Sequence, residues 1–173
     1  MIIQFCGMSG AGKTTLAELA KVKLNLLNIS VEIIDGDEYR ETISCDLGFS
    51  KADRIENIRR LGFIASKFSI KNMVAIISAI NPYEEARREL KQKYTNVKTV
   101  FVNCLLSELI KRDTKGLYKR AMLPEGHVDK INNLTGINDP FEIPENADLV
   151  IDTDSESIED SVKKLISFIF SNK

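Results

Sequence analysis

The feature that most constrains the fold is a glycine-rich segment near the start of the chain, Gly7–Thr14, which reads GMSGAGKT. An apolar, β-prone run precedes it over 2–6, and apolar residues at helical spacing follow it over 16–24. A strand, a tight glycine turn and a helix in this order form a loop that binds nucleotide phosphates. The phosphates would lie at the N-terminus of the following helix, where the helix dipole favours negative charge.

This loop also predicts which groups contact the phosphates. Its backbone N–H groups would cradle phosphate oxygens, Lys13 would reach the β- and γ-phosphates, and the Thr14 hydroxyl would be an oxygen ligand for Mg²⁺. The predicted binding residues are contiguous: Gly7, Met8, Ser9, Gly10, Ala11, Gly12, Lys13, Thr14 and Thr15. The loop alone predicts only that a nucleotide binds.

Strand-like and helical segments alternate along the rest of the chain. Apolar runs predict strands over 2–6, 31–35, 73–79, 97–103 and 148–152; helical spacing predicts helices over 51–71 and 83–93, from about 107, and after a cap at Ser155. Such alternation favours a parallel sheet with helices on both faces. We therefore predict a single α/β domain over 1–173, a P-loop NTPase-type fold with three layers, α/β/α, around five parallel strands.

The segment 114–144 interrupts this pattern, because it has weak periodicity and several Gly, Pro and Asn residues. A stretch of that length inside a compact domain is usually a functional lid. The basic residues in and beside it would neutralise phosphate charge and exclude water: Arg112, Lys115, Lys119 and Arg120. The alternative is a solvated basic loop.

Composition excludes several classes of partner. The 24 Lys and Arg residues nearly balance the 25 Asp and Glu residues, so the chain lacks the basic excess of proteins that bind nucleic acid or membrane surfaces. The chain enters a core strand at once, and we expect no secretory leader. Three cysteines without metal-like spacing, Cys6, Cys45 and Cys104, predict reduced thiols in a cytoplasmic protein.

Two carboxylates favour a small-molecule kinase over other nucleotide-binding proteins. The chain has no Asn-Lys-x-Asp guanine motif, and its third and fourth predicted strands do not end in an acidic residue. Asp35 and Asp37 instead follow the second strand, whose carboxyl end should face the ligand crevice. There they could hold Mg²⁺ through its waters and accept a proton from an attacking hydroxyl. The alternative is a solvated Asp-Gly-Asp turn.

Arginines predict a site for a second anionic ligand. Arg54 and Asn57 are three residues apart on the predicted helix and can share a face. Arginine forks suit phosphate and sulfate, so we assign Arg40 and Arg54 to the substrate. For Arg59 and Arg60 we favour a surface position or internal pairing.

These motifs together resemble those of adenylylsulfate kinases in order and spacing. The resemblance is carried by GMSGAGKTT, Asp35-Gly36-Asp37, DLGFS at 46–50, ADR at 52–54, ENIRR at 56–60, KGLYK at 115–119, TGI at 135–137, PFE at 140–142 and PEN at 144–146. It implies ATP- and Mg²⁺-dependent phosphorylation of the ribose 3′-hydroxyl of adenosine 5′-phosphosulfate. It also implies a homodimer.

The resemblance implies roles for individual residues. Arg40, Phe49, Arg54 and Asn57 resemble the acceptor site, and Lys115 and Leu117 resemble lid contacts to the acceptor. Arg112 is placed to cover the ATP adenine. Asp37 is the first choice for the base that orients the 3′-hydroxyl, and Asp35 for the water shell of Mg²⁺, with that division left open.

Three positions depart from the family pattern, all on the acceptor side. Asn81 replaces a serine, so a phosphoserine intermediate is excluded there and direct transfer is expected. Glu84 replaces an arginine and should disfavour a further anion nearby. Leu134 replaces an aromatic residue expected to stack on adenine. These changes leave open the same reaction on cytidine 5′-diphosphoramidate in capsule biosynthesis, and an inactive nucleotide-binding regulator as a third possibility.

Overall fold

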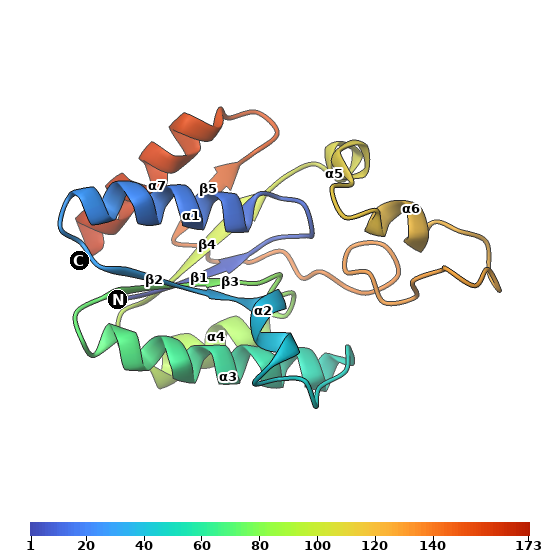
Figure 1. Cartoon of the computed structure of the whole chain (residues 1–173), viewed down its shortest axis with the longest axis horizontal. Coiled ribbons are helices and arrows are strands. Elements are labelled where there is room, and N and C mark those ends of the chain that lie inside the picture. Colours follow the sequence, from blue (N-terminus) through green and yellow to red (C-terminus); the bar gives the residue numbers. More distant parts are fainter.

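The computed structural model describes residues 1–173 and contains the predicted five-stranded parallel sheet (Figure 1). The strand order is β2-β3-β1-β4-β5, so β1 lies at the centre between β3 and β4. The strands are β1 (Ile2–Cys6), β2 (Val31–Asp35), β3 (Val74–Ser78), β4 (Val97–Asn103) and β5 (Leu149–Asp152). Residues of β1 and β3 are wholly buried, as expected of central strands covered on both faces.

Two helical layers enclose the sheet, which confirms the α/β/α prediction. Helices α1 (Lys13–Leu26) and α7 (Ile158–Asn172) cover one face, and α3 (Lys51–Ser69) and α4 (Glu84–Lys93) cover the other (Figure 1). Alternate side chains of β1 point into two different hydrophobic cores. Ile3 and Phe5 pack with α1 and α7, while Ile2 packs with α3 and α4. The period of two along the strand therefore builds both layers.

Some predicted boundaries shift by one or two residues, and one predicted cap is wrong. The helix predicted over 51–71 ends at Ser69, and the strand predicted over 73–79 covers Val74–Ser78. Helix α7 is capped by Ser157, whose hydroxyl accepts a hydrogen bond from the Asp160 N–H at 3.1 Å. Ser155 instead donates to the Asp152 carbonyl in the preceding turn and cannot cap the helix.

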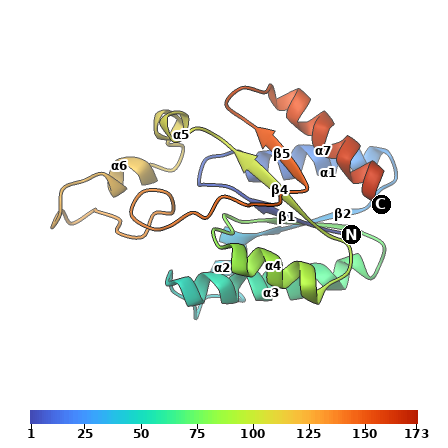
Figure 2. The ribbon, with the colours of Figure 1, turned by 180° about the vertical axis from the view of Figure 1, so that it is seen from behind.

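The connections at the carboxyl ends of the strands carry the remaining helices. Helix α2 (Gly36–Glu41) directly follows β2, α5 (Leu106–Arg112) follows β4, and α6 (Leu117–Ala121) lies inside the segment predicted as a lid. Seen from behind, this segment extends beyond the sheet on the side of the strand carboxyl ends (Figure 2). The rest of 114–144 has little regular structure, as its weak periodicity predicted.

Further findings concern single side chains and the membrane. Cys6 and Cys104 are buried and Cys45 is exposed, and all three are free thiols. His127 is exposed in the lid segment. None of the helices combines the length and the apolarity that a bilayer crossing demands.

Candidate functional site

The glycine-rich loop connects β1 to α1 and depends on backbone shapes that glycine permits. Gly12, the N-cap of α1, has φ 94°, in the left-handed region that L side chains rarely adopt. A Cβ at Gly7 would collide with the Val102 carbonyl of the neighbouring strand. These glycines therefore let the loop turn tightly over the end of the sheet, where its N–H groups can converge on an anion.

Lys13 is folded back into the loop. Its side chain is only 9% exposed, and Nζ donates to the carbonyl oxygens of Gly7 at 2.9 Å and Met8 at 2.8 Å. Burial lowers the pKa of Lys13 to about 8, although the charge of nearby Asp37 acts in the opposite direction. Both hydrogen-bond partners of this ammonium group are neutral carbonyl oxygens. A bound triphosphate would place negative charge beside it.

Thr14, Asp35 and Ser78 bring oxygen atoms together beside the loop. The Thr14 hydroxyl donates to Asp35 Oδ2 at 2.9 Å and lies 3.1 Å from the Ser78 hydroxyl. Asp35 also caps α2, since its Oδ1 accepts from the Asp37 N–H at 2.9 Å. Three hard oxygen donors suit Mg²⁺, which keeps several waters and takes few protein ligands. Sequence reasoning missed Ser78, although its place at a strand end was a usable signal.

Asp37 faces the segment predicted as a lid. Its side chain is 75% exposed and forms an ion pair with Lys115, which precedes α6. The hydrogen bond from Lys115 to Asp37 raises the pKa of Lys115. This ion pair joins the lid segment to the first turn of α2. The sequence analysis assigned Lys115 to a lid contact with the acceptor and Asp37 to the base.

Arg54 is held in place by protein groups before any ligand binds. It is 7% exposed and pairs with Asp139 at 2.7 Å. It also donates to the carbonyl oxygens of Phe49 at 3.0 Å and Asn133 at 2.7 Å. Because Asp139 and Asn133 belong to the lid segment, Arg54 connects α3 to the lid.

Arg40 and Asn57 complete this side of the site. The Arg40 guanidinium lies 4.7 Å from the centre of the Phe49 ring and donates to the Gly48 carbonyl. Asn57 is buried, and its side-chain oxygen has no hydrogen-bond partner. An unpaired buried oxygen is unfavourable, so a ligand donor or water would stabilise it.

Two adjoining cavities bring the predicted residues together. A cavity of about 660 Å³ extends from the loop to the lid and is lined by Ser9, Gly10, Gly12, Lys13, Thr14, Thr15, Asp35, Asp37, Phe49, Arg54, Lys115 and Leu117, among others. A second cavity of about 280 Å³ shares Asp37, Phe49 and Arg54 with it and adds Arg40 and Asn57. The arrangement has room for two ligands that meet at Asp37.

The structure also identifies lining residues that sequence reasoning did not assign. Leu134 and Thr135 of the lid line the larger cavity, and the Tyr118 hydroxyl donates to the Ser9 carbonyl at 2.8 Å. Leu134 was noted only as a departure from a family pattern. Tyr118 and Ser9 are 109 residues apart, and no local pattern indicates that contact.

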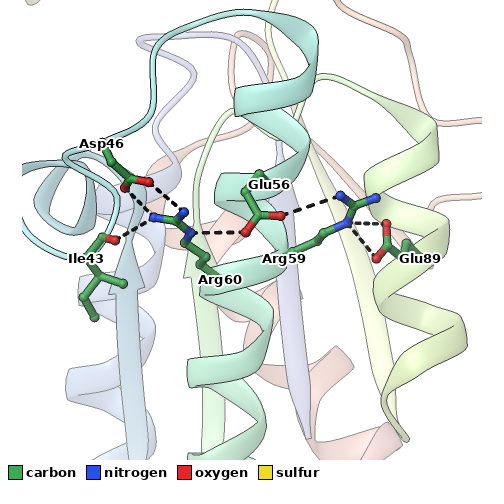
Figure 3. Close-up of polar contacts among 6 residues, drawn as sticks. All are labelled: Ile43, Asp46, Glu56, Arg59, Arg60 and Glu89. Atoms are coloured by element: carbon green, nitrogen blue, oxygen red, sulfur yellow. Dashed lines mark hydrogen bonds and ion pairs between the residues drawn. The ribbon is translucent and has the colours of Figure 1, made fainter.

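Not every predicted residue lines the cavities. Arg112 lines neither cavity: it donates to the Thr153 carbonyl at 2.6 Å, and the Thr153 hydroxyl donates to the carbonyl of Ala11 in the loop, so Arg112 is connected to the loop through Thr153. Arg59 and Arg60 pair internally, as predicted: Arg59 pairs with Glu89 of α4, and Arg60 with Asp46 (Figure 3). These ion pairs on partly exposed side chains connect α3 to its neighbours, and their residues line neither cavity.

Comparisons with known proteins agree on one family. The family model described as adenylylsulphate kinase matches residues 1–152. An adenylyl-sulfate kinase from Microcystis aeruginosa is 45% identical over 92% of this chain and 85% of its own. A probable bifunctional SAT/APS kinase from Sorangium cellulosum is 42% identical over 96% of this chain, which spans 28% of that longer protein. The APS kinase CysC from Mycobacterium tuberculosis, solved with AMPPNP and APS, superposes with a TM-score of 0.90 at 33% identity, covering 98% of this chain and 96% of its own.

Proposed function

The chain belongs to the adenylylsulphate kinase family, and from this premise we propose that it transfers the γ-phosphoryl group of ATP to the ribose 3′-hydroxyl of adenosine 5′-phosphosulfate (APS). The product would be 3′-phosphoadenosine 5′-phosphosulfate. The observation that carries the proposal is the pair of adjoining cavities, one against the glycine-rich loop and one against Arg40 and Asn57, which share Asp37.

On the donor side, the loop N–H groups and Lys13 would hold the triphosphate. Lys13 would leave the Gly7 and Met8 carbonyls for the phosphates and neutralise the charge that spreads over the transferred group. Mg²⁺, when bound, would screen the phosphate oxygens, and Thr14 and Asp35 would hold it, Asp35 through water. Arg112, which is connected to the loop through Thr153, would lie over the adenine.

On the acceptor side, Arg40, Arg54 and Asn57 would bind the phosphosulfate, and Phe49 would pack against the adenine. Asp37 would accept the proton of the 3′-hydroxyl while that oxygen forms a bond to the γ-phosphorus. The bond between the γ-phosphorus and the oxygen that bridges the β- and γ-phosphates would break, and ADP would leave with the electron pair of that bond. Lys115 and Leu117 of the lid would contact the acceptor, and lid closure would exclude water, which otherwise competes as a nucleophile.

Two alternatives define the decisive test. Cytidine 5′-diphosphoramidate would use the same chemistry, but none of the named relatives is described as acting on it. An inactive regulator would not need Lys13, Thr14, Asp35 and Asp37 together. We expect kcat/KM for APS to exceed that for the cytidine compound when the two are compared side by side. The reverse preference would reject APS and keep the reaction class, and absence of turnover with both would favour the regulator.

We also propose that the protein works as a cytoplasmic homodimer. Light scattering after size-exclusion chromatography would give the mass of a single chain if this expectation is wrong.

A further inference from the structure

The most deeply buried charged side chain lies outside the proposed reaction site. Arg87, in α4, is 1% exposed and has no contact with either cavity. A buried guanidinium is unfavourable unless its donors are paired. Its three nitrogen atoms all have partners: Nε bonds Glu84 on the same helix, and the other two bond carbonyl groups in two further segments, the loop after β3 and the end of the lid segment.

One partner is the loop that follows β3. Arg87 Nη1 donates to the Asn81 carbonyl at 2.7 Å. Asn81 has φ 45°, in the left-handed region, and its side chain donates to Gln4 of β1 at 3.1 Å. Gln4 in turn donates to the Arg87 carbonyl at 3.0 Å, which closes a ring of hydrogen bonds. This ring fixes the loop whose residues Ile80, Asn81 and Pro82 line the smaller cavity.

The other partner is the end of the lid segment. Arg87 Nη2 donates to the Glu142 carbonyl at 2.7 Å, while the Glu142 N–H donates to the Pro82 carbonyl at 2.8 Å. The Glu142 carboxylate accepts from the Glu84 N–H at 2.7 Å. The lid therefore returns to the domain at the same place where the loop after β3 is held.

The counter-charge for Arg87 is Glu84, one of the three departures from the family pattern. Arg87 Nε donates to Glu84 Oε2 at 2.9 Å. Glu84 lines neither of the two cavities, so its carboxylate neutralises a buried guanidinium and does not face the acceptor. This differs from the expectation that Glu84 repels a further anion.

We propose that Arg87 is a positioning residue for the acceptor: it holds the cavity wall at 80–82 and the end of the lid at Glu142 in a fixed relation. The proposal rests on the proposed function, because it concerns the acceptor half of that site. One guanidinium can do this because its planar fork bonds two carbonyl groups at once, whereas a lysine ammonium has no fork.

The test compares Arg87→Lys and Glu84→Gln with a matched control, Glu89→Gln. Glu89 lies on the same helix and forms an ion pair with Arg59, away from the site (Figure 3). Glu84→Gln keeps the shape of the side chain and its acceptor oxygen, and it keeps the test valid if Arg87→Lys does not fold. Each variant is measured for KM of the acceptor, kcat, Kd of ATP and hydrogen exchange at the Glu142 N–H.

We expect Arg87→Lys to raise KM for APS about tenfold, and Glu84→Gln to raise it by a smaller factor, with Kd for ATP unchanged. Exchange at Glu142 should accelerate in both and stay unchanged in Glu89→Gln. An acceptor KM within twofold of the control, or equal loss of ATP and acceptor binding, would overturn the proposal. Hydrogen exchange needs no turnover, so it tests how Arg87 holds the lid segment at Glu142 even if APS is not the substrate. Inactivity of the wild-type protein with APS would count against the proposed function alone.

Discussion

The side chains of Lys115 and Asp37 form an ion pair between the lid and the first turn of α2. Both residues point to the cavity where the two ligands would meet. In this state the candidate base is already neutralised by a lid lysine. In the proposed mechanism, a bound acceptor would have to replace that interaction before Asp37 could receive a proton, so the pair would connect lid position to base availability.

Replacement of this base separates chemistry from binding. Asp37→Asn keeps the shape of the side chain but cannot accept the proton, so kcat should fall about 10²- to 10⁴-fold with little change in Kd for ATP. Steady-state kinetics and ATP titration measure the two effects. Asp46→Asn is the control, because Asp46 pairs with Arg60 on the surface (Figure 3). An unchanged kcat in Asp37→Asn would remove Asp37 from the base role.

Lys13→Ala should abolish phosphoryl transfer and leave the fold intact, because the two hydrogen bonds of its ammonium group go to carbonyl groups of its own loop. Turnover with APS and the far-UV circular dichroism spectrum check the two parts. Near-normal turnover would contradict the assignment of the loop as the ATP site.

The depressed pKa of Lys13 predicts a pH dependence of ATP binding. In the free protein this pKa is lowered to about 8 by burial, so the ammonium form is lost as the pH rises through that value. In the proposed site ATP would bind the ammonium form, and its affinity should therefore fall between pH 8 and 9.5. Isothermal titration with ATP across this range measures the effect. AMP, which lacks the β- and γ-phosphates, is the control and should bind with the same affinity throughout.

Arg54→Lys should raise KM for the acceptor about tenfold or more, because a lysine cannot reproduce the paired donors that suit phosphate and sulfate. KM for ATP should stay within about twofold, since Arg54 makes its hydrogen bonds and its ion pair to Phe49, Asn133 and Asp139 and none to the glycine-rich loop. Arg60→Lys, at a half-buried position of the same helix that lines neither cavity, is the matched control and should leave both constants unchanged. Equal effects of the two substitutions would contradict the acceptor assignment.

Leu134 offers a test of base recognition. It lines the same cavity as Phe49, and Leu134→Phe would restore a π-face there. Aromatic pairs contribute about 0.5–1.5 kcal/mol, so KM for APS should fall by roughly two- to tenfold. Leu134→Met controls for size without a ring. A rise in KM for APS would show that the cavity cannot accept the larger side chain.

The parts of the fold that follow from local pattern could be predicted from the sequence. Apolar runs marked all five strands, and Asp35 could be placed beside the loop because parallel strands end at the same edge of the sheet. The sequence could also have identified Ser157 as the cap of α7. Of the two serines, Ser157 is the one with an acidic residue three positions later, at Asp160.

Other features depend on contacts that no local pattern encodes. Arg54 pairs with Asp139, and Arg87 with the carbonyl of Glu142. Each of these two contacts joins a helix of the domain to the lid segment across a long sequence separation. A basic residue on a helix has the same local sequence pattern whether its side chain is solvated or buried. The sequence therefore indicated that arginines matter near the acceptor but could not indicate which ones are structural.

The two chain termini lie side by side at the end of the molecule opposite the lid (Figures 1 and 2). Asn96 contacts both ends: its carbonyl accepts from the Ile2 N–H, and its side chain donates to the Asn172 carbonyl at 3.4 Å. A fluorescent reporter or an affinity tag at either end would thus leave the ligand crevice open. A short peptide could also join the ends, which makes the domain suitable for circular permutation.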